Sequence, residues 1–209
     1  MEFLIVIPFL VIPAFYIFAS ETLKKIKRKS EITEFASRRF SIIIAAKNEE
    51  NNLPNLLNCL KKQNYPPDLL EIIIVDDNST DNTYACAHSF LNDFPHIKVI
   101  KAGRKILPGK KGALEKGIEV SRKEFILITD ADCRPSKNWV SSFNNAFAKK
   151  YEVVFGHAPM VEGKSLAGRL SCYENLRSSI LTFTMAESGF PYSAAARSFG
   201  FTYKFFSQA

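Results

Sequence analysis

Five acidic residues of this 209-residue chain follow directly on apolar runs of strand length, where carboxylates can do chemistry. They are Glu49, Asp76, Asp77, Asp130 and Asp132. A carboxylate beside an apolar core is costly unless it is paired or bound to a metal ion, so chance would not place all five there. Parallel strands end at one edge of their sheet, and ligands of open α/β sheets bind at that edge. We therefore predict that the five residues share one site.

Asp130 and Asp132 flank the small Ala131 in the sequence DADC, directly after the apolar run 125–129. The first carboxylate is expected at the strand end, and the turn would bring the second toward the same ligand. Two hard oxygen donors at this spacing suit Mg²⁺ or Mn²⁺, with diphosphate oxygens and water completing the coordination. An isolated Asp-x-Asp is more often a turn with helix-capping aspartates. The strand before it and two further polar loops favour the metal site.

Those two loops supply polar groups suited to a nucleotide. In DDNSTDNT, after the second predicted strand, residues 79–81 are expected mainly to cap the next helix. Asp76 or Asp77 would face the ligand and accept hydrogen bonds from a base N–H or a ribose hydroxyl. In AAKNEE, after the first strand, Lys47 and Glu49 are placed to frame the same base and ribose. An exposed loop lysine is a nearly equal interpretation of Lys47.

A basic, glycine-rich segment, GRKILPGKKGALEKG, occupies residues 103–117 and leads into a predicted helix. Its first basic side chains are Arg104, Lys105, Lys110 and Lys111. Backbone N–H groups at the helix start and lysine charge would together offset the phosphate charge of a donor. The segment is not a Walker A motif, because neither the upstream glycine pattern nor a Ser or Thr after the lysine is present. ATP hydrolysis is therefore not indicated.

Strand-length apolar runs alternate with helical patterns along most of the chain. Strands are predicted at 40–44, 71–75, 97–100, 125–129 and 153–155, and helices near 53–60, 83–91, 113–120, 139–148 and 165–188. Continuous rather than alternating β-branched runs are typical of strands buried on both faces. The sequence therefore predicts an α/β fold with a mostly parallel sheet flanked by helices. Residues 189–209 are aromatic-rich and have no evident further element.

The amino-terminal residues predict a membrane anchor. Residues 3–19 form an uncharged apolar run near the lower limit of the ~20 residues that a bilayer-spanning helix needs. Lys24, Lys25, Lys27, Arg28 and Lys29 follow it. By the positive-inside rule these residues place the remainder of the chain on the cytoplasmic side. We expect a single-pass anchor over 1–23 in the inner (plasma) membrane, a basic linker over 24–39 and a cytoplasmic domain over 40–209.

Composition narrows the remaining function classes. With 46% hydrophobic residues the chain can bury one sizeable core. Its net charge of +7 is concentrated beside the predicted anchor, and no nucleic-acid-binding motif is present, so nucleic acid is not an expected partner. Four scattered cysteines without a Cys-x-x-Cys pair indicate neither a zinc knuckle nor a disulfide framework.

Taken in order, these motifs resemble the family 2 glycosyltransferases, which are inverting enzymes with a GT-A fold, over roughly 40–155. SIIIAAKNEENNLPNLLNCL is similar to the opening strand and helix of that family, and EIIIVDDNSTDNT to its most characteristic signature. GKKGALEKG is similar to its Gly-Lys-x-x-Ala-Leu segment, and LITDADCRP to its metal-binding strand. The resemblance implies base and ribose recognition around Ala46, Glu49 and Asp77, with Lys110 near the donor. It also implies Asp130 near the nucleotide or sugar and Asp132 on the metal.

The resemblance implies a metal-dependent enzyme that transfers a sugar from a nucleotide-diphosphate sugar. From the predicted anchor alone, we expect this enzyme to be membrane-anchored and its acceptor to be a glycan or a lipid-linked molecule. Family members use a later acidic residue as general base, and this chain offers no candidate for it, so the chain is expected to be truncated before that region. Two alternatives stay open. One is a nucleotide-sugar-binding remnant without transferase activity. The other is a GT-A-like nucleotidyltransferase, although AAKNEE stands where such enzymes carry a glycine-rich basic loop.

Overall fold

The computed structural model of this protein describes residues 13–24, 36–160 and 165–208. These residues form two compact units. The larger unit holds residues 36–156 and 195–208, and the smaller holds 13–24, 157–160 and 165–194. Most of the linker expected over 24–39 lies outside the described residues, and the expected domain boundaries stay predictions.

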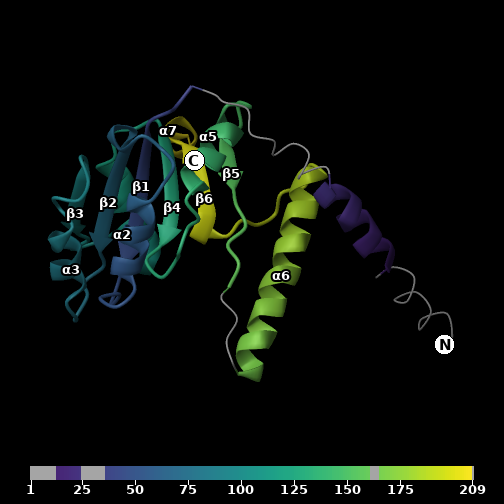
Figure 1. Cartoon of the computed structure of the whole chain (residues 1–209), viewed down its shortest axis with the longest axis horizontal. Helices are drawn as coiled ribbons and strands as arrows, with labels where there is room; N and C mark the ends of the chain where they lie inside the picture. The colour runs from purple at the N-terminus through teal and green to yellow at the C-terminus, as the bar shows by residue number, and fades with distance from the viewer. Residues whose placement is uncertain (1–12, 25–35, 161–164, 209) are drawn as a thin grey trace. The chain divides into compact units, whose positions relative to one another are not determined.

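A six-stranded sheet with the strand order β3-β2-β1-β4-β6-β5 forms the centre of the larger unit (Figure 1). Four neighbouring strands are parallel: β1 (Phe40–Ala46), β2 (Leu70–Asp76), β3 (Ile97–Lys101) and β4 (Phe125–Asp130). Every residue of β2 and all but one of β1 are buried, as continuous apolar runs require. The predicted α/β fold with a mostly parallel sheet is thus confirmed in these four strands.

The other two strands make the sheet mixed. β6 (Phe199–Thr202) lies between β4 and β5 (Val153–Phe155) and is antiparallel to both. The expectation of no further element in residues 189–209 was therefore wrong, and a short helix, α7 (Tyr203–Ser207), also lies there. Gly200 explains the weak strand signal, because glycine disfavours a strand interior. It is needed, since a Cβ there would lie 2.8 Å from Leu127 and 3.0 Å from Phe143.

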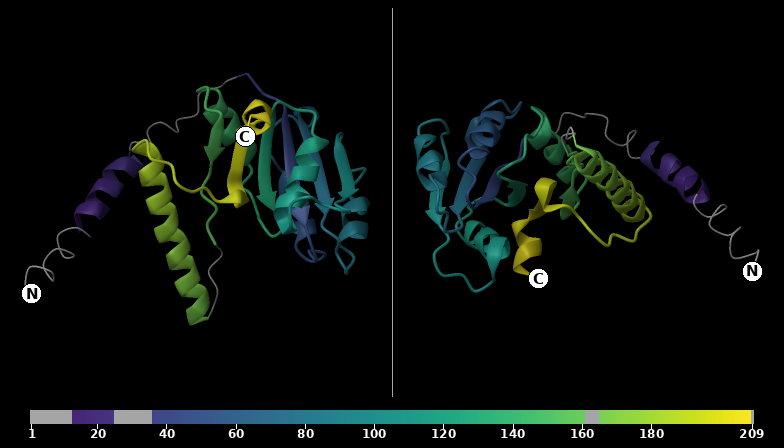
Figure 2. Two further views of the ribbon diagram at one scale, coloured as in Figure 1. Left: turned by 180° about the vertical axis from the view of Figure 1, so that it is seen from behind. Right: turned by 90° about the horizontal axis from the view of Figure 1, so that it is seen from below.

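Helices cover both faces of the sheet, and Figure 2 shows α4 on the side opposite to α2. The helices α2 (Leu53–Lys61), α3 (Thr83–Ser89) and α5 (Trp139–Phe147) pack on the face that carries Ile42 and Ile44. The helix α4 (Gly109–Glu119) packs on the other face through Ile118, against Ile43. Single turns at Pro67–Leu69 and Ala196–Ser198 precede β2 and β6. Each helix predicted between residues 53 and 148 is present.

In the smaller unit, α6 (Leu166–Glu187) confirms the long helix predicted over 165–188. Ser165 caps it, with its Oγ accepting a hydrogen bond from the Gly168 N–H at 3.1 Å. The other helical residues of this unit are 13–24. Ile180 of α6 and Tyr16 line the same hollow with residues 19, 20, 23 and 24, so the two helical segments of this unit share a surface.

The predicted transmembrane anchor over residues 1–23 is wrong for the part of it that the structure describes. Across the described ranges, no helix combines the length and the apolar character needed to cross a membrane. Residues 13–24 include Glu21 and Lys24, paired at 2.6 Å. The predicted single-pass localisation in the inner membrane depended on this anchor and is therefore also wrong. Residues 1–12 lie outside the described part.

Candidate functional site

Three neighbouring strands bring polar residues to one edge of the sheet. Ala46, Asp76 and Asp130 are the last residues of β1, β2 and β4. Ala46 pairs with Asp76 in register, and Asp130 pairs with Ala45, so the two aspartates stand on either side of the end of β1. Asp76 is buried and Asp130 half-buried. A carboxylate held there needs a positive or hydrogen-bonding partner, as unpaired burial is unfavourable.

The loop after β2 is tied back to the strand ends. The Asp77 N–H donates to the carbonyl oxygen of Ala46 at 2.7 Å, which continues the β1–β2 ladder by one residue. The carboxylate of Asp76 accepts a hydrogen bond from the N–H of Ser79 at 3.3 Å. Asn78 between them has a positive φ of 56°, a left-handed conformation that asparagine tolerates better than most residues. The Asp76 carboxylate is therefore hydrogen-bonded within its own loop, whereas the Asp77 carboxylate is available to groups outside this loop.

Asn48 links the loops after β1 and β2. Its N–H donates to the hydroxyl oxygen of Ser79 at 3.0 Å, and its side-chain carbonyl accepts from the N–H of Thr80 at 2.8 Å. Asn48 also has a positive φ of 57°. Asn48 thus donates from its backbone to a side chain of the second loop, and its side chain accepts from the backbone of that loop. These two hydrogen bonds fix the loops against each other.

Glu50 repeats this reciprocal arrangement one step further along. Its N–H donates to the carboxylate of Asp81 at 3.2 Å, and its own carboxylate accepts from the N–H of Asn82 at 2.9 Å. The N–H and hydroxyl of Thr83 both donate to Asp81, at 3.0 and 2.5 Å. Burial by itself would raise the pKa of Asp81, but these hydrogen bonds lower it below its ordinary value.

The expectation that residues 79–81 mainly cap the next helix was only partly right. α3 begins at Thr83 with Asn82 as its N-cap, and the Asn82 side chain makes no capping hydrogen bond. Of the three residues, Asp81 alone contacts the helix start, and Ser79 and Thr80 are used by Asn48 instead. Hydrogen bonds thus join the loop after β1 (residues 47–52) and the loop after β2 (residues 77–82) into one surface, which we call the ledge.

Two residues predicted for the base and ribose lie on the first of these loops. Lys47 is exposed, in keeping with either interpretation of it. Glu49 is half-buried; its N–H donates to the Thr83 hydroxyl oxygen at 2.7 Å, and its carboxylate accepts from the Asn52 side chain at 2.8 Å. The Glu49 carboxylate is thus engaged with the start of α2.

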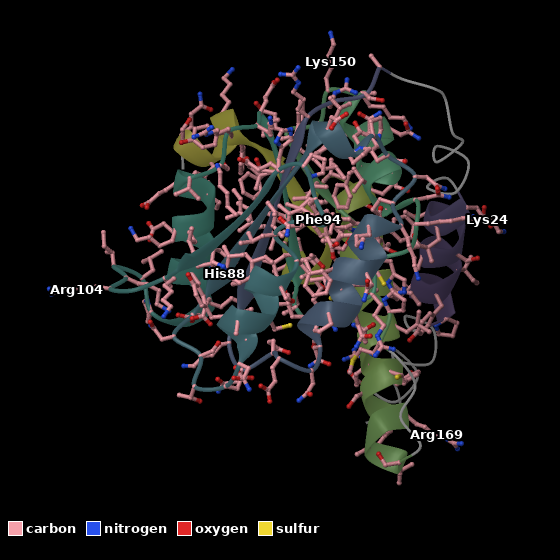
Figure 3. All side chains as sticks on the ribbon, turned by 60° about the vertical axis from the view of Figure 1, so that its left-hand side comes forward. Lys24, His88, Phe94, Arg104, Lys150 and Arg169 are labelled. Carbon is pink, nitrogen blue, oxygen red and sulfur yellow. The ribbon has the colours of Figure 1, made fainter. Side chains whose placement is uncertain are left out.

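Lys105 pairs with Asp77, a contact that the sequence analysis missed. Its ammonium donates to the Asp77 carboxylate and, at 2.9 Å, to the carbonyl oxygen of Gly109. Its neighbour Arg104 extends away from the unit into solvent, as Figure 3 shows. The basic residues of this segment indicated a contact with an anion. Nothing in the sequence indicated that Lys105 and Asp77, which are 28 residues apart, would be partners.

A second lysine of the same segment reaches the second aspartate. The ammonium of Lys110, in the first turn of α4, donates to the Asp130 carboxylate. Asp132 is exposed in the turn that follows β4. The carboxyl edge thus carries two lysine–aspartate pairs, one at the end of β2 and one at the end of β4.

The residues near Asp130 fit a metal ion that takes few ligands from the protein. Within the described ranges, no group of three or more His, Cys, Asp or Glu side chains could hold a metal. Burial raises the pKa of the Cys133 thiol above its ordinary value. Asp130 and Asp132 are hard oxygen donors, and Asp130 already carries a cationic partner.

A hollow of about 670 Å³ lies away from this edge, beside β3 and the end of α4. Its one carboxylate, Glu119, is paired with Lys116 at 2.9 Å. No second carboxylate lines it, so we do not place the chemistry there.

Comparisons with known proteins agree with this geometry. The family model described as Glycosyl transferase family 2 matches residues 41–202. The beta-monoglucosyldiacylglycerol synthase of Synechocystis sp. is 35% identical over 97 residues, which are 46% of this chain and 20% of that protein. The probable glycosyltransferase YdaM of Bacillus subtilis is 36% identical over 104 residues, 47% of this chain and 24% of that protein. The matches span only a fifth to a quarter of these relatives.

Two solved structures have a similar fold. The mannosyltransferase PcManGT from Pyrobaculum calidifontis, in complex with GDP-Man and Mn²⁺, superposes with a TM-score of 0.65 at 19% identity. That similarity covers 93% of this chain and 55% of that one. S. aureus TarS 1-349 in complex with UDP-GlcNAc has a TM-score of 0.53 at 28% identity, over 61% of this chain and 36% of that one.

Proposed function

We propose a function from one premise: the chain belongs to glycosyl transferase family 2, whose model matches residues 41–202. We propose that it binds a nucleotide-diphosphate sugar at the carboxyl edge of its sheet and transfers the sugar to an acceptor. The observation that carries this proposal is the meeting of Asp77 and Asp130 with Lys105 and Lys110 at that edge. Carboxylates suit a base, a ribose or a metal, and lysines suit a diphosphate.

The nucleoside end of the donor belongs at the ends of β1 and β2 in this proposal. Asp77 would accept hydrogen bonds from a base N–H or a ribose hydroxyl, next to Ala46 and with Asp76 beneath it. Glu49 and Lys47 border the same place on the loop after β1. The ledge formed by the two loops supports the idea, because reciprocal hydrogen bonds hold it in shape before a ligand arrives. UDP-GlcNAc bound to TarS and GDP-Man bound to PcManGT leave both uridine and guanosine donors as candidates.

The diphosphate end belongs at the end of β4. Asp130 and Asp132 would hold Mg²⁺ or Mn²⁺, and Lys110 would face the phosphate oxygens from the start of α4. When bound, such an ion neutralises charge that develops on the leaving diphosphate. Backbone N–H groups at the amino end of α4 add partial positive charge toward the same group.

For the acceptor we propose a glycan or a lipid-linked molecule. The support is the printed name of one relative, a synthase of a glucosyldiacylglycerol, which is a glycolipid. We assign no general base for an acceptor hydroxyl, since each carboxylate that the described residues place at this edge has a role in the loops or in the donor site.

Isothermal titration of the full chain with UDP and with GDP, with and without Mn²⁺, tests the proposal. We expect one nucleotide to bind, and to bind more tightly when Mn²⁺ is present. Binding of neither nucleotide under any of these conditions would refute the donor site. Binding of one with no change on adding Mn²⁺ would keep the nucleotide site and refute the metal role of Asp130 and Asp132.

A further inference from the structure

We infer that Lys110 is an exchangeable counter-ion of the donor site. Without a donor its ammonium occupies the Asp130 carboxylate, and when metal and nucleotide bind it leaves Asp130 for the diphosphate. Lys105 is its fixed counterpart, which keeps its pair with Asp77 throughout. The inference rests on the proposed function, because it assigns the diphosphate and the metal to the end of β4.

The exposure of the two ion pairs separates their roles. The side chains of Lys105 and Asp77 are 12% and 8% exposed, whereas those of Lys110 and Asp130 are 44% and 24% exposed. Breaking a buried pair leaves an uncompensated charge away from water, which is strongly unfavourable. A partly exposed pair is screened by water and contributes little. Of the two lysines, only Lys110 can change partner at small cost.

The backbone that carries Lys110 is fixed, so the exchange needs a side-chain movement alone. Lys105 cannot move in this way, because its ammonium also donates a hydrogen bond to the carbonyl oxygen of Gly109 at 2.9 Å. A Cβ at Gly112 would overlap the carbonyl oxygen of Leu107, so the loop lies directly against the first turn of α4. At the other end of the helix, a Cβ at Gly117 would overlap Ile43. The four-carbon stem of lysine can still carry its ammonium between nearby acceptors.

Charge balance explains why the exchange takes place. An ammonium and a divalent cation repel each other when both lie against one carboxylate. The diphosphate that accompanies the metal offers Lys110 new anionic acceptors, and hydrogen bonds between charged groups are among the stronger ones. Lys110 therefore opposes metal binding in the absence of nucleotide and favours nucleotide binding in the presence of metal.

These opposite effects give the test, with Lys110→Met as the variant and Lys111→Met as its matched control. Lys111 is exposed in the same helical turn, and its loss changes the net charge equally. Mn²⁺ alone is titrated while free Mn²⁺ is followed by electron paramagnetic resonance, and UDP and GDP with Mn²⁺ are titrated by calorimetry. We expect Lys110→Met to bind Mn²⁺ alone about two- to fivefold more tightly than wild type. We expect it to bind the nucleotide with Mn²⁺ about tenfold more weakly.

Lys111→Met should leave the affinity for Mn²⁺ alone unchanged, and Lys110→Arg, which keeps a cation at the position, should return it toward wild type. Equal affinities of wild type and Lys110→Met for Mn²⁺, or binding of Mn²⁺ by neither, would overturn the inference while normal nucleotide binding by wild type keeps the proposed function. If wild type binds neither nucleotide, the proposed function itself fails. Equal melting temperatures of the variants show that each is folded.

Discussion

Replacing Glu71 by alanine should destabilise the fold without touching the candidate site. Glu71 lies near the start of β2, at the edge of the sheet opposite to Asp76, and is 3% exposed. Its carboxylate accepts three hydrogen bonds: from the Ser41 hydroxyl at 2.6 Å, the Lys98 ammonium at 2.7 Å and the Arg122 N–H at 2.9 Å. The carboxylate thus joins β1, β2, β3 and the residues before β4.

The size of the effect follows from which donors lose their partner. Ser41 is fully buried, so in Glu71→Ala its hydroxyl loses its acceptor away from water, at about 1–3 kcal/mol. Lys98 is partly exposed and Arg122 exposed, so the Lys98 ammonium and the Arg122 N–H turn to water and add little. We expect the free energy of unfolding to fall by about 2 kcal/mol. For a chain of this size that lowers the melting temperature by about 4–8 °C.

Thermal unfolding followed by circular dichroism measures this, with Glu152→Ala as the matched control. Glu152 is exposed, so the same substitution there should change the free energy of unfolding by no more than about 0.5 kcal/mol. Nucleotide affinity of Glu71→Ala, measured well below its midpoint, should equal that of wild type. A melting temperature of Glu71→Ala within about 2 °C of the control would refute the reasoning.

The same carboxylate predicts a pH dependence. Burial by itself would raise the pKa of Glu71, but the hydrogen bonds from Lys98, Ser41 and the Arg122 N–H lower it below its ordinary value of 4.5. A carboxylate with a lowered pKa in the folded state stabilises above its unfolded pKa, and this contribution is lost as the pH falls through the folded pKa. Wild type should therefore exceed Glu71→Gln in melting temperature at pH 7, and the difference should shrink below pH 4.5. A constant difference would contradict this.

Four further substitutions test other parts of the structure. Asp132→Ala should abolish the effect of Mn²⁺ on nucleotide binding and leave the melting temperature unchanged, because Asp132 is exposed; Asp130→Ala should weaken that effect, and calorimetry checks both. Asn48→Ala removes the acceptor of the Thr80 N–H, so the nucleotide should bind about five- to tenfold more weakly in the same titration. Gly117→Ala should lower the free energy of unfolding by about 1–3 kcal/mol in denaturant titrations, because its Cβ would overlap Ile43.

The sequence predicted those parts of the fold that depend on local pattern. Runs such as 42–44 and 72–75 are apolar at every position because both faces of β1 and β2 are covered, and this leaves a continuous signal. The placing of Asp76 and Asp130 at one edge follows from parallel strand direction alone. β6 escaped because four residues with a central Gly200 are too short a pattern to distinguish from a loop.

Contacts between segments distant in the sequence were beyond such reasoning. The pattern of GRKILPGKK indicates a basic loop, but the fold decides that Lys105 turns inward while Arg104 turns out. The anchor prediction was wrong for a different reason. An apolar run reports composition, whereas the helical residues that the structure describes reach past the run to Glu21 and Lys24.

The hydrogen bond from the Gly156 N–H to the Ser198 carbonyl oxygen, at 2.8 Å, has a consequence for engineering the chain. It closes the gap between the point where the chain leaves the larger unit, after Gly156, and the point where it returns, at Ala195. The chain therefore leaves and re-enters the larger unit at adjoining points, and exchange of a segment between such points is often tolerated. A short linker in place of 157–194 would keep β5 and β6 in register, giving a minimal sheet domain for nucleotide titrations.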